Sequence, residues 1–463
     1  MSVRLEDLGP CFQGIVPALI ATCDAAGEPN VTYLSQVHYV DPGHVALSRQ
    51  FFNKTQRNIA ENPYATIQLY DPRSFEAWRL RLRFHHAETS GPLFDVIATR
   101  IQVIASHTGM TGVFRLISAD VYEVLEVAPV EGFLAPPDPR TAADPRCDEV
   151  PGPLTELRGL QAVSQRIARA QDLECLLSAA LGALDEVFGF RHSMVLVPDE
   201  SGARLVTIAS HGYGEQGIGA EVAVGEGLLG TVAAQRRMVR MAAVGGSLSY
   251  GRAIRQRVEA AEGRARLAPE IPLAGLADAQ AELALPLLAG DHLVGVLAVE
   301  STAPLAFDEW DEAFLQIVAN QIAMGVDAMQ EDEEGAAASH PQRRAADARD
   351  FRPGRCELVY YRSDEVLFAD GEYLVRGVPA KILWKILRQR LDEGRTEFLN
   401  RELRLDPSLG LPGYKDNLES RLILLRKRLE SKCPGIRMVP VRRGRFALEV
   451  SCRIELAERD ASA

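Results

Sequence analysis

Leu293-Val-Gly-Val-Leu-Ala-Val-Glu300 decides the fold of the middle of this chain, because it is a short, β-prone and almost entirely apolar run. Such runs are typical of strands buried in a sheet. Three similar runs occupy residues 193–197, 205–209 and 282–288. Apolar residues recur every three or four positions from Leu154 to Val187, which predicts one helical stripe, and a closing helix is expected from Asp308 to Met329. The sequence therefore predicts a helix, a sheet and a helix.

Two polar segments separate this middle region from its neighbours. Residues 135–153 are rich in Pro, which removes backbone donors, and residues 331–350 are rich in charged and small side chains that have little to bury. The chain has 463 residues, which suits about three domains at roughly 150 residues each. We expect globular regions at 1–134, 154–330 and 351–458, joined by these two linkers.

The first region is rich in short β-prone runs, separated by turn signals such as Asp41-Pro-Gly43. The runs lie at residues 14–22, 31–40, 44–48, 65–70, 78–86 and 121–127. Helical patches are visible only near 52–62 and 94–108. Many short strands with two helices favour a barrel.

The last region has a different order of elements. A strand pair at 358–361 and 366–368 precedes helices at 379–393, about 400–405 and 415–432, and a hairpin spans 438–448. Leu418, Leu422, Leu425 and Leu429 form one apolar face of the third helix. Strands, three helices and a basic hairpin are the order of a winged helix-turn-helix.

Charge is distributed unevenly along the chain, whose net charge is -12. Residues 351–463 hold 23 Lys and Arg against 17 Asp and Glu, which gives +6 and leaves -18 for residues 1–350. Basic surfaces attract phosphate backbones and acidic surfaces repel them. If nucleic acid is a partner, the last region is expected to bind it.

Several function classes lack support in the sequence. No apolar stretch reaches the roughly 20 residues of a membrane helix and no signal-peptide pattern opens the chain, so we expect a cytoplasmic protein without a membrane partner. The seven cysteines are scattered and never spaced C-x-x-C, and His192, His211 and His292 are isolated, so no metal site is predicted. Motifs of ATPases, metalloproteases and serine hydrolases are absent, and no catalytic residue is predicted.

The middle region resembles a GAF domain. The resemblance rests on Gly225-Glu-Gly-Leu-Leu-Gly-Thr-Val232, Leu285-Pro-Leu-Leu288 and Gly295-Val-Leu-Ala-Val-Glu300, and it spans most of residues 160–328. It implies an α/β sensor domain without naming a ligand, because the cyclic-nucleotide signature of some GAF domains is not visible as a whole. The segment from Gly245 to Ala281 is either a lid over a ligand or a surface loop with a short helix.

The first region resembles the FMN-binding split barrel of the pyridoxamine 5'-phosphate oxidase-like proteins, through residues 44–55, 57–63 and 65–67. The resemblance implies that Arg49, Lys54 and Thr55 hold the flavin phosphate, since a cationic turn at a helix N-terminus adds side-chain charge to unpaired backbone N–H groups. Family members often carry a second basic residue where this chain has Thr55. Two alternatives therefore stay open, a bound FMN and an empty barrel kept as a sensor or dimerisation scaffold.

The last region resembles the response-regulator-type winged-helix DNA-binding domain, through residues 371–387, 398–403, 416–429 and 436–446. The resemblance implies DNA contacts by Lys415, Ser420, Arg421, Arg426 and Lys427 of the third helix and by Arg442, Arg443 and Arg445 of the wing. Ile423 and Leu424 stand where polar or basic groups are expected. Either base reading is weak there, or these two residues pack on a partner such as RNA polymerase or a second subunit.

The sequence as a whole predicts a multidomain α+β protein that consists of a split β-barrel, a GAF domain and a C-terminal winged helix-turn-helix. The expected function is that of a one-component, ligand- or redox-responsive transcription regulator that binds DNA, responds to FMN or another small molecule, and forms a homodimer through the terminal helices of its GAF domain. The alternative is a flavin-dependent oxidoreductase of the pyridoxamine 5'-phosphate oxidase-like type with regulatory domains.

Overall fold

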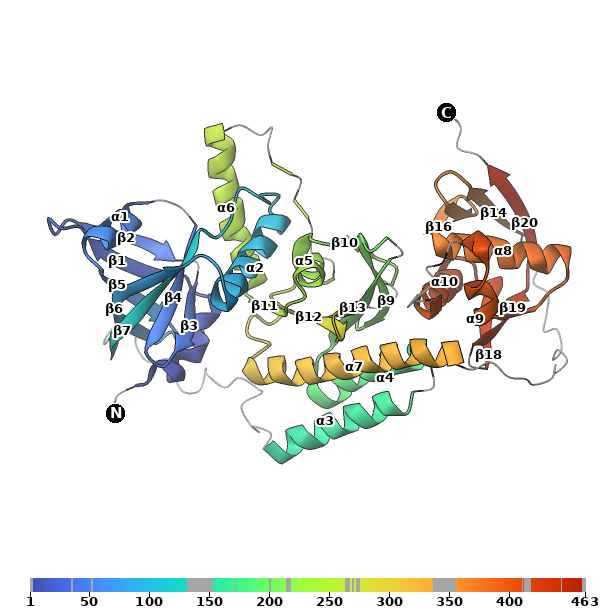
Figure 1. Ribbon diagram of the computed structural model, residues 1–463, viewed down its shortest axis with the longest axis horizontal. Helices are drawn as coiled ribbons and strands as arrows, with labels where there is room; N and C mark the ends of the chain where they lie inside the picture. The colour runs from blue at the N-terminus through green and yellow to red at the C-terminus, as the bar shows by residue number, and fades with distance from the viewer. Residues whose placement is uncertain are drawn as a thin grey trace. The chain divides into compact units, whose positions relative to one another are not determined.

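A computed structural model provides the structure of the protein (Figure 1). The chain packs into two compact units, the first made of residues 1–157, 225–284 and 300–312, and the second of residues 158–224, 285–299 and 313–463. The middle region thus contributes elements to both units. The structure describes residues 3–34, 36–50, 53–130, 153–170, 172–199, 201–213, 218–262, 267–268, 270–271, 275–335, 355–409, 411, 418–442 and 444–459.

The first region forms a seven-stranded antiparallel sheet with the order β2-β1-β5-β6-β7-β4-β3. Its elements are η1 (Leu5–Gln13), β1 (Ala18–Cys23), β2 (Pro29–Leu34), β3 (Val37–Asp41), β4 (His44–Arg49), α1 (Lys54–Glu61), β5 (Tyr64–Tyr70), β6 (Ala77–Glu88), α2 (Pro92–His107) and β7 (Ser118–Pro129). Alternate residues are buried, as Ala65, Ile67 and Leu69 are on β5, which is the period of a half-buried strand. This architecture confirms the split-barrel prediction.

Two details of the first region differ from the sequence prediction. The single strand expected at 31–40 is two strands, β2 and β3, and the short helix η1 was not expected at all. Leu5, Leu8 and Phe12 of η1 are buried in the barrel core, so tertiary packing holds a segment that has little local helical signal.

The middle region contains a six-stranded sheet with the order β10-β9-β8-β13-β12-β11. Its strands are β8 (His192–Pro198), β9 (Arg204–His211), β10 (Glu221–Ala223), β11 (Val239–Ala242), β12 (Ala281–Ala289) and β13 (His292–Ser301), and its helices are α3 (Pro153–Ala168), α4 (Leu173–Phe188), α5 (Gly227–Gln235), α6 (Val244–Glu262) and α7 (Glu309–Gly335). The prediction of one helical stripe from Leu154 to Val187 was wrong. The helix is interrupted, and Asp172 starts α4 anew by accepting a hydrogen bond from the Cys175 backbone N–H at 2.8 Å.

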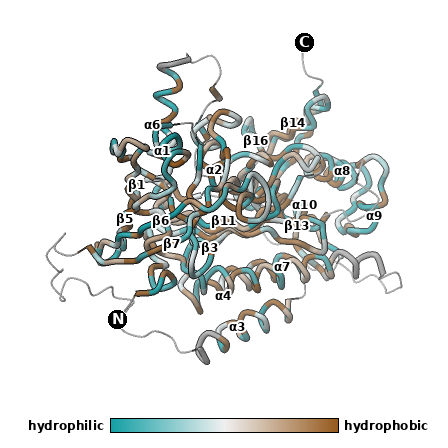
Figure 2. The backbone as a smooth tube through the Cα atoms, turned by 60° about the vertical axis from the view of Figure 1, so that its left-hand side comes forward, coloured by the Kyte–Doolittle hydropathy of each residue, from teal (hydrophilic) through white to brown (hydrophobic). Residues whose placement is uncertain are grey.

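Helices α4 and α7 each carry both apolar and polar residues along their length (Figure 2). Leu176, Leu181 and Leu184 of α4 are buried, as are Val318 and Ile322 of α7. Another face of α7 is apolar but uncovered, because Trp310, Ile317 and Met324 are 69, 43 and 69% exposed. These three residues follow each other at intervals of seven, so they lie on one side of the helix.

The last region holds two small sheets around three helices. Its elements are β14 (Arg355–Tyr361), β15 (Val366–Ala369), β16 (Glu372–Arg376), α8 (Val378–Asp392), β17 (Glu397–Leu399), α9 (Asn400–Arg404), η3 (Pro407–Leu409), α10 (Leu418–Lys432), β18 (Ile436–Arg442), β19 (Arg445–Val450) and β20 (Arg453–Arg459). The sheets have the orders β16-β15-β14-β20 and β17-β19-β18. Strands β16, β17 and β20 were missed, and β20 pairs in parallel with the distant β14, a contact that local pattern cannot reveal.

The predicted apolar face of α10 is confirmed, since Leu418, Leu422, Leu425 and Leu429 are all buried in the core of this region. The three expected helices and the closing hairpin are present within a residue or three of their expected bounds. None of the helices in the described ranges is long and apolar enough to cross a membrane.

The start of α5 is capped by residues of α2 rather than by its own N-cap residue, Glu226, which makes no side-chain cap hydrogen bond. The Gly227 N–H donates to Ser106 Oγ at 2.7 Å, and the Leu228 N–H donates to His107 Nε2 at 3.1 Å. A Cβ at Gly227, whose φ is +61°, would lie 3.1 Å from the His107 ring, so glycine is needed there. Two unpaired N–H groups of α5 are thereby satisfied across the first unit.

His107 is held in its neutral form by this contact. Its Nδ1 lies 2.9 Å from the Ile271 carbonyl oxygen, which can only accept, so Nδ1 carries the proton and Nε2 is the acceptor. Burial lowers the pKa of His107, and the charge of Arg252 lowers it further against the opposing effect of the Ile271 hydrogen bond. Protonation at Nε2 would remove the acceptor that Leu228 needs.

We predict that His107→Gln reduces the free energy of unfolding by about 1–3 kcal/mol at pH 7.5, because it leaves buried partners unsatisfied. Since the folded pKa lies below the unfolded value near 6.5, the stabilisation by His107 is complete above about pH 6.5 and is lost as the pH falls below it. Urea unfolding at pH 7.5 and pH 5.5 should show a larger loss for the unchanged protein than for His107→Gln. An exposed control, His292→Gln, should behave as the unchanged protein. Equal pH dependence in all three would contradict the assignment.

Candidate functional site

The turn between β4 and α1 forms one wall of a cavity of about 100 Å³ in the first unit. Arg49 and Thr55 both line it, together with Asn53 and Gln56 from the start of α1. Asn53 caps α1 by accepting a hydrogen bond from the Gln56 backbone N–H at 3.1 Å. The cavity therefore has a guanidinium, a hydroxyl and the N-terminus of an eight-residue helix at one end.

Two of the three residues expected to hold a flavin phosphate line this cavity, and the third does not. The Arg49 Nε lies 4.0 Å from Asp120 Oδ1, and Thr55 Oγ1 accepts from Asn30 Nδ2 at 2.9 Å. The Lys54 ammonium instead forms an exposed ion pair with Glu28 at 2.8 Å. Arg49 and Thr55 thus come together at the cavity, whereas Lys54 is directed to a carboxylate. The donor chemistry of the cavity fits a phosphate group.

The described part of the segment between Gly245 and Ala281 packs against the barrel. Helix α6, which it contains, runs beside α2 (Figure 1), and a Cβ at Gly251 would lie within 2.9 Å of side-chain atoms of Ile104 and Thr108. Tyr250 of α6 lines the cavity beside Arg49. The described part of this segment is thus a long helix that packs on α2 of the barrel, and the two readings left open from the sequence stay open.

Two buried carboxylates face each other in the middle sheet. Glu282 of β12 and Glu300 of β13 are both buried, and Glu300 Oε2 accepts from the Leu276 N–H at 2.7 Å. Glu282 Oε1 has no hydrogen-bond partner among the described residues. Burial raises the pKa of Glu282 to about 8, and the charge of Glu300 raises it as well. At neutral pH this pair therefore holds a proton, a feature that an alternating strand pattern does not reveal.

Three cysteines of the last region gather in space although they are scattered in the sequence. Cys356 is the second residue of β14, Cys433 follows α10 and Cys452 precedes β20, and all three are free thiols. A hydrogen bond from Cys356 lowers the pKa of Cys433, while the same contact and burial raise the pKa of Cys356. In the described ranges no group of His, Cys, Asp and Glu has the arrangement of a metal site.

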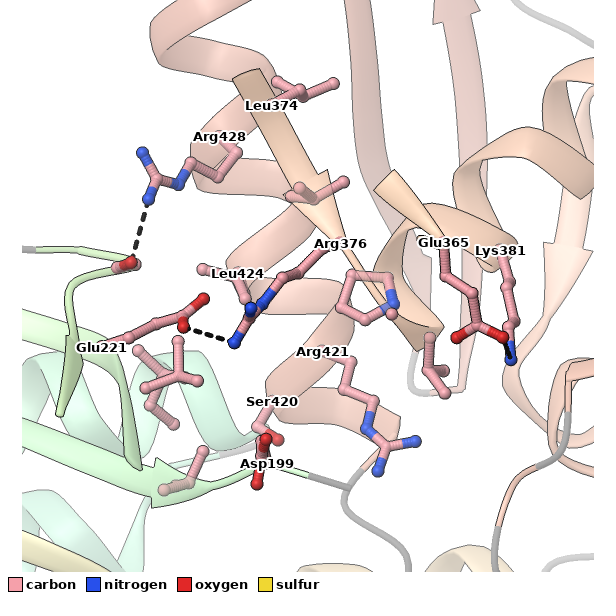
Figure 3. A pocket seen from close by; sticks show the side chains of 18 of the residues that line it. Asp199, Glu221, Glu365, Leu374, Arg376, Lys381, Ser420, Arg421, Leu424 and Arg428 are labelled. Atoms are coloured by element: carbon pink, nitrogen blue, oxygen red, sulfur yellow. Dashed lines mark hydrogen bonds and ion pairs between the residues drawn. The ribbon is translucent and has the colours of Figure 1, made fainter. Parts of the chain in front are cut away.

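The basic side chains of α10 contact residues of the middle region within the second unit. Arg426 pairs with Glu174, the first-turn acid of α4, and Lys427 Nζ lies 3.1 Å from the same carboxylate. Arg428 donates to the Gly219 carbonyl oxygen at 2.9 Å, and Arg376 of β16 pairs with Glu221 at 2.7 Å. Figure 3 shows the last two contacts. A single acidic side chain thus neutralises two of the predicted DNA contacts.

These contacts border a cavity of about 420 Å³ lined by both regions. Ser420, Arg421 and Leu424 of α10 line it opposite Asp199 and Glu221 (Figure 3). Ser420 is 3% exposed. Ile423 is also buried and lines a neighbouring cavity with Leu173 and Glu174. The two apolar residues that stand out on α10 therefore face the chain's own middle region.

Two of the remaining predicted DNA contacts, Arg442 and Arg445, belong to strands β18 and β19 of the hairpin. Arg445 donates to Glu397 Oε2 at 3.1 Å, within the sheet that joins β17 to β19. Arg442 ends β18. Lys415 and Arg443 lie outside the described residues. Sequence reasoning identified Arg426 and Lys427 but gave no sign that Glu174 would be their partner, and it did not single out Arg376, the partner of Glu221, because these sequence separations exceed 150 residues.

Comparisons with known proteins agree with two of the predicted domains. The family model of the GAF domain matches residues 172–326, and the model described as pyridoxamine 5'-phosphate oxidase matches residues 10–107. The chain therefore contains a GAF domain and an N-terminal domain of the pyridoxamine 5'-phosphate oxidase type, as the sequence predicted. The comparison with curated proteins found no match.

Solved structures with similar parts include a GAF domain, a reductase and an FMN-binding protein. The GAF domain of an Acinetobacter phosphoenolpyruvate-protein phosphotransferase is 18% identical, with a TM-score of 0.31, over 39% of this chain and 97% of its own. A free methionine-R-sulfoxide reductase of Neisseria meningitidis, in complex with its substrate, is 19% identical, with a TM-score of 0.31, over 38% and 91%. An FMN-binding protein of Syntrophomonas wolfei is 18% identical, with a TM-score of 0.22, over 27% and 87%.

Proposed function

We propose that this chain is a one-component transcription regulator whose barrel and GAF domain receive a small-molecule or redox signal and whose residues 351–463 bind DNA as a winged helix. The order of the last region supports the proposal, since a sheet, three helices and a closing hairpin are what such domains contain. Its positive charge, opposed to the negative charge of residues 1–350, supports it further.

The observation that carries the proposal is the pairing of Arg426 and Lys427 with one carboxylate, Glu174. A phosphate of DNA would make the same charge-assisted contacts with these two side chains. DNA and the GAF domain therefore compete for one face of α10. A signal that loosens the Glu174 and Glu221 contacts would release α10, which gives the sensor domain a physical means of control.

We expect Glu174→Gln with Glu221→Gln to raise DNA affinity several-fold, because each partly exposed ion pair contributes about 0.2–1 kcal/mol. Arg442→Ala with Arg443→Ala should instead weaken binding to all sequences and lower the salt slope of log affinity by about one to two, at roughly 0.9 per phosphate contact. Fluorescence anisotropy on fragments of the protein's own promoter, over a salt series, measures both effects.

The matched control is Glu449→Gln on β19, a carboxylate outside these contacts, which should leave affinity within about twofold of the unchanged chain. The fragment 351–463, which contains its own buried core, should bind at least as tightly as the double Gln variant. Absence of DNA affinity in both at low salt would exclude the regulator.

We propose that the barrel binds FMN, whose phosphate would be held by Arg49, Thr55 and the start of α1. When bound, FMN would supply redox chemistry to the sensor. Because the Lys54 ammonium pairs with Glu28, we expect Lys54 to contribute less to phosphate binding than Arg49.

We predict that Arg49→Gln lowers FMN affinity by about 1.5–3 kcal/mol, as one charge-assisted phosphate contact contributes, and that Lys54→Gln lowers it by less than about 1 kcal/mol. Quenching of flavin fluorescence measures both. The exposed Arg57→Gln serves as control. Equal affinity of the Arg49 variant and the unchanged protein would show that the phosphate lies elsewhere, and no binding by either would favour the empty barrel.

We also propose a homodimer formed along α7, because Trp310, Ile317 and Met324 leave an apolar stripe uncovered. Light scattering should give about twice the monomer mass of 50.7 kDa at micromolar concentration. Ile317→Lys with Met324→Lys should give monomers, since two charges would be desolvated in the interface. Leu405→Lys, which replaces an exposed leucine of the last region, should stay dimeric. A monomeric unchanged protein would contradict the proposal.

A further inference from the structure

A second cavity of the barrel, of about 450 Å³, adjoins the one beside Arg49. The two share Tyr33, Ser48, Gln50 and Tyr250 as lining residues. The second cavity extends away from Arg49 and Thr55, between β3 and α2 of the barrel and the start of α6. Gly246 and Ser247 of α6 complete its wall, so the GAF domain contributes part of it.

Most of the wall of this cavity is apolar. Ile97, Ile101 and Ile104 present one side of α2, and Phe114 stands edge-on to Tyr250, with ring centroids 6.3 Å apart. Such a surface suits rings and methylene groups, which gain free energy on leaving water. Gln36 and Gln50 are held in place by hydrogen bonds to the Phe12 carbonyl oxygen and to Ser48 Oγ.

Arg100 of α2 is the cation of this cavity. Its guanidinium donates to the Gln13 carbonyl oxygen at 3.3 Å, and among the described residues no carboxylate lies within ion-pair distance of it. Burial lowers the pKa of Arg100 to about 10, with a further contribution from the charge of Arg240. Arg240 itself is neutralised by Glu312 at 2.8 Å. Arg100 is only partly buried, and no carboxylate among the described residues balances its charge, so an anion in the cavity would gain charge-assisted contacts with it.

His38 of β3 lines the same cavity and adds no charge. Burial lowers its pKa to about 3, and the neighbouring charge of Arg100 lowers it as well. A neutral imidazole still offers one donor and one acceptor. The cavity thus combines a single positive charge, a neutral polar ring and apolar walls.

We infer that this cavity binds an organic monoanion with an apolar, ring-containing body, such as an aromatic carboxylate, whose anionic group pairs with Arg100. The anionic group would take the charge-assisted hydrogen bonds that Arg100 does not make within the protein. The body of the ligand would contact Tyr250 and Phe114. Because Tyr250 belongs to α6, a bound ligand would contact this helix of the GAF domain directly. The site adjoins the proposed flavin phosphate site but does not include Arg49 or Thr55, and it gives the proposed sensor a ligand class. Its test does not involve DNA, so it can fail or succeed independently of the regulator.

The probes are 8-anilinonaphthalene-1-sulfonate, an aromatic monoanion, and N-phenyl-1-naphthylamine, which has the same rings without the charge. Fluorescence titrations of the full chain compare them. Arg100→Met should lower the affinity of the sulfonate at least about tenfold and leave that of the neutral amine within about twofold. Arg100→Lys should restore part of the lost affinity. The control Arg81→Gln should change neither, because that exposed guanidinium pairs with Glu126 at 3.3 Å and lines neither cavity.

A second variant covers the case in which Arg100→Met does not fold, which circular dichroism would show. Ser247→Trp fills the cavity from α6 and should abolish binding of both probes at this site. Unchanged sulfonate affinity in Arg100→Met, or in a folded Ser247→Trp, overturns the assignment. It is also overturned if FMN displaces the sulfonate and Arg100→Met weakens both equally, since Arg100 would then belong to the flavin site.

Discussion

The N-terminus of α5 has no cap of its own, and Ser106 and His107 at the end of α2 accept its first N–H groups. Buried backbone donors must find partners, so this contact ties the GAF helix to the barrel more firmly than apolar packing alone. Gly227 allows the close approach, and the neutral form of His107 provides the acceptor. The position of α6 next to α2 depends on these two hydrogen bonds, and so does the wall that α6 contributes to both barrel cavities.

The first unit is therefore better described as one packed body than as two independent modules. Tyr250 of the GAF domain lines both cavities of the barrel, and Arg255 donates to the Thr108 carbonyl oxygen at 2.7 Å. A ligand in either cavity would touch residues of both domains at once. Coupling of this kind needs no long pathway, since differential contacts with α6 are enough to shift its position.

In the second unit, ion pairs join the last region to the middle region. The basic face of α10 is suited to phosphates, but in this structure Glu174 and the Gly219 carbonyl oxygen occupy its cations. The partition of charge between the front and the end of the chain thus has two consequences. It leaves the positive charge in the last region, where the proposed DNA contacts lie, and it supplies acidic side chains of the middle region that pair with the same cations.

The sequence determined the local elements and the kinds of domain. Apolar period, turn signals and short motifs were enough for the barrel strands, the GAF elements around Gly225 and Gly295, and the buried leucines of α10, because these depend on neighbours within a few residues. Only the tertiary structure decided which distant groups meet. Arg100 and His38 share a cavity, Lys54 is taken by Glu28, Glu174 holds Arg426, and three scattered cysteines converge, since such contacts follow from the packing of elements far apart in the chain and leave no periodic trace in it.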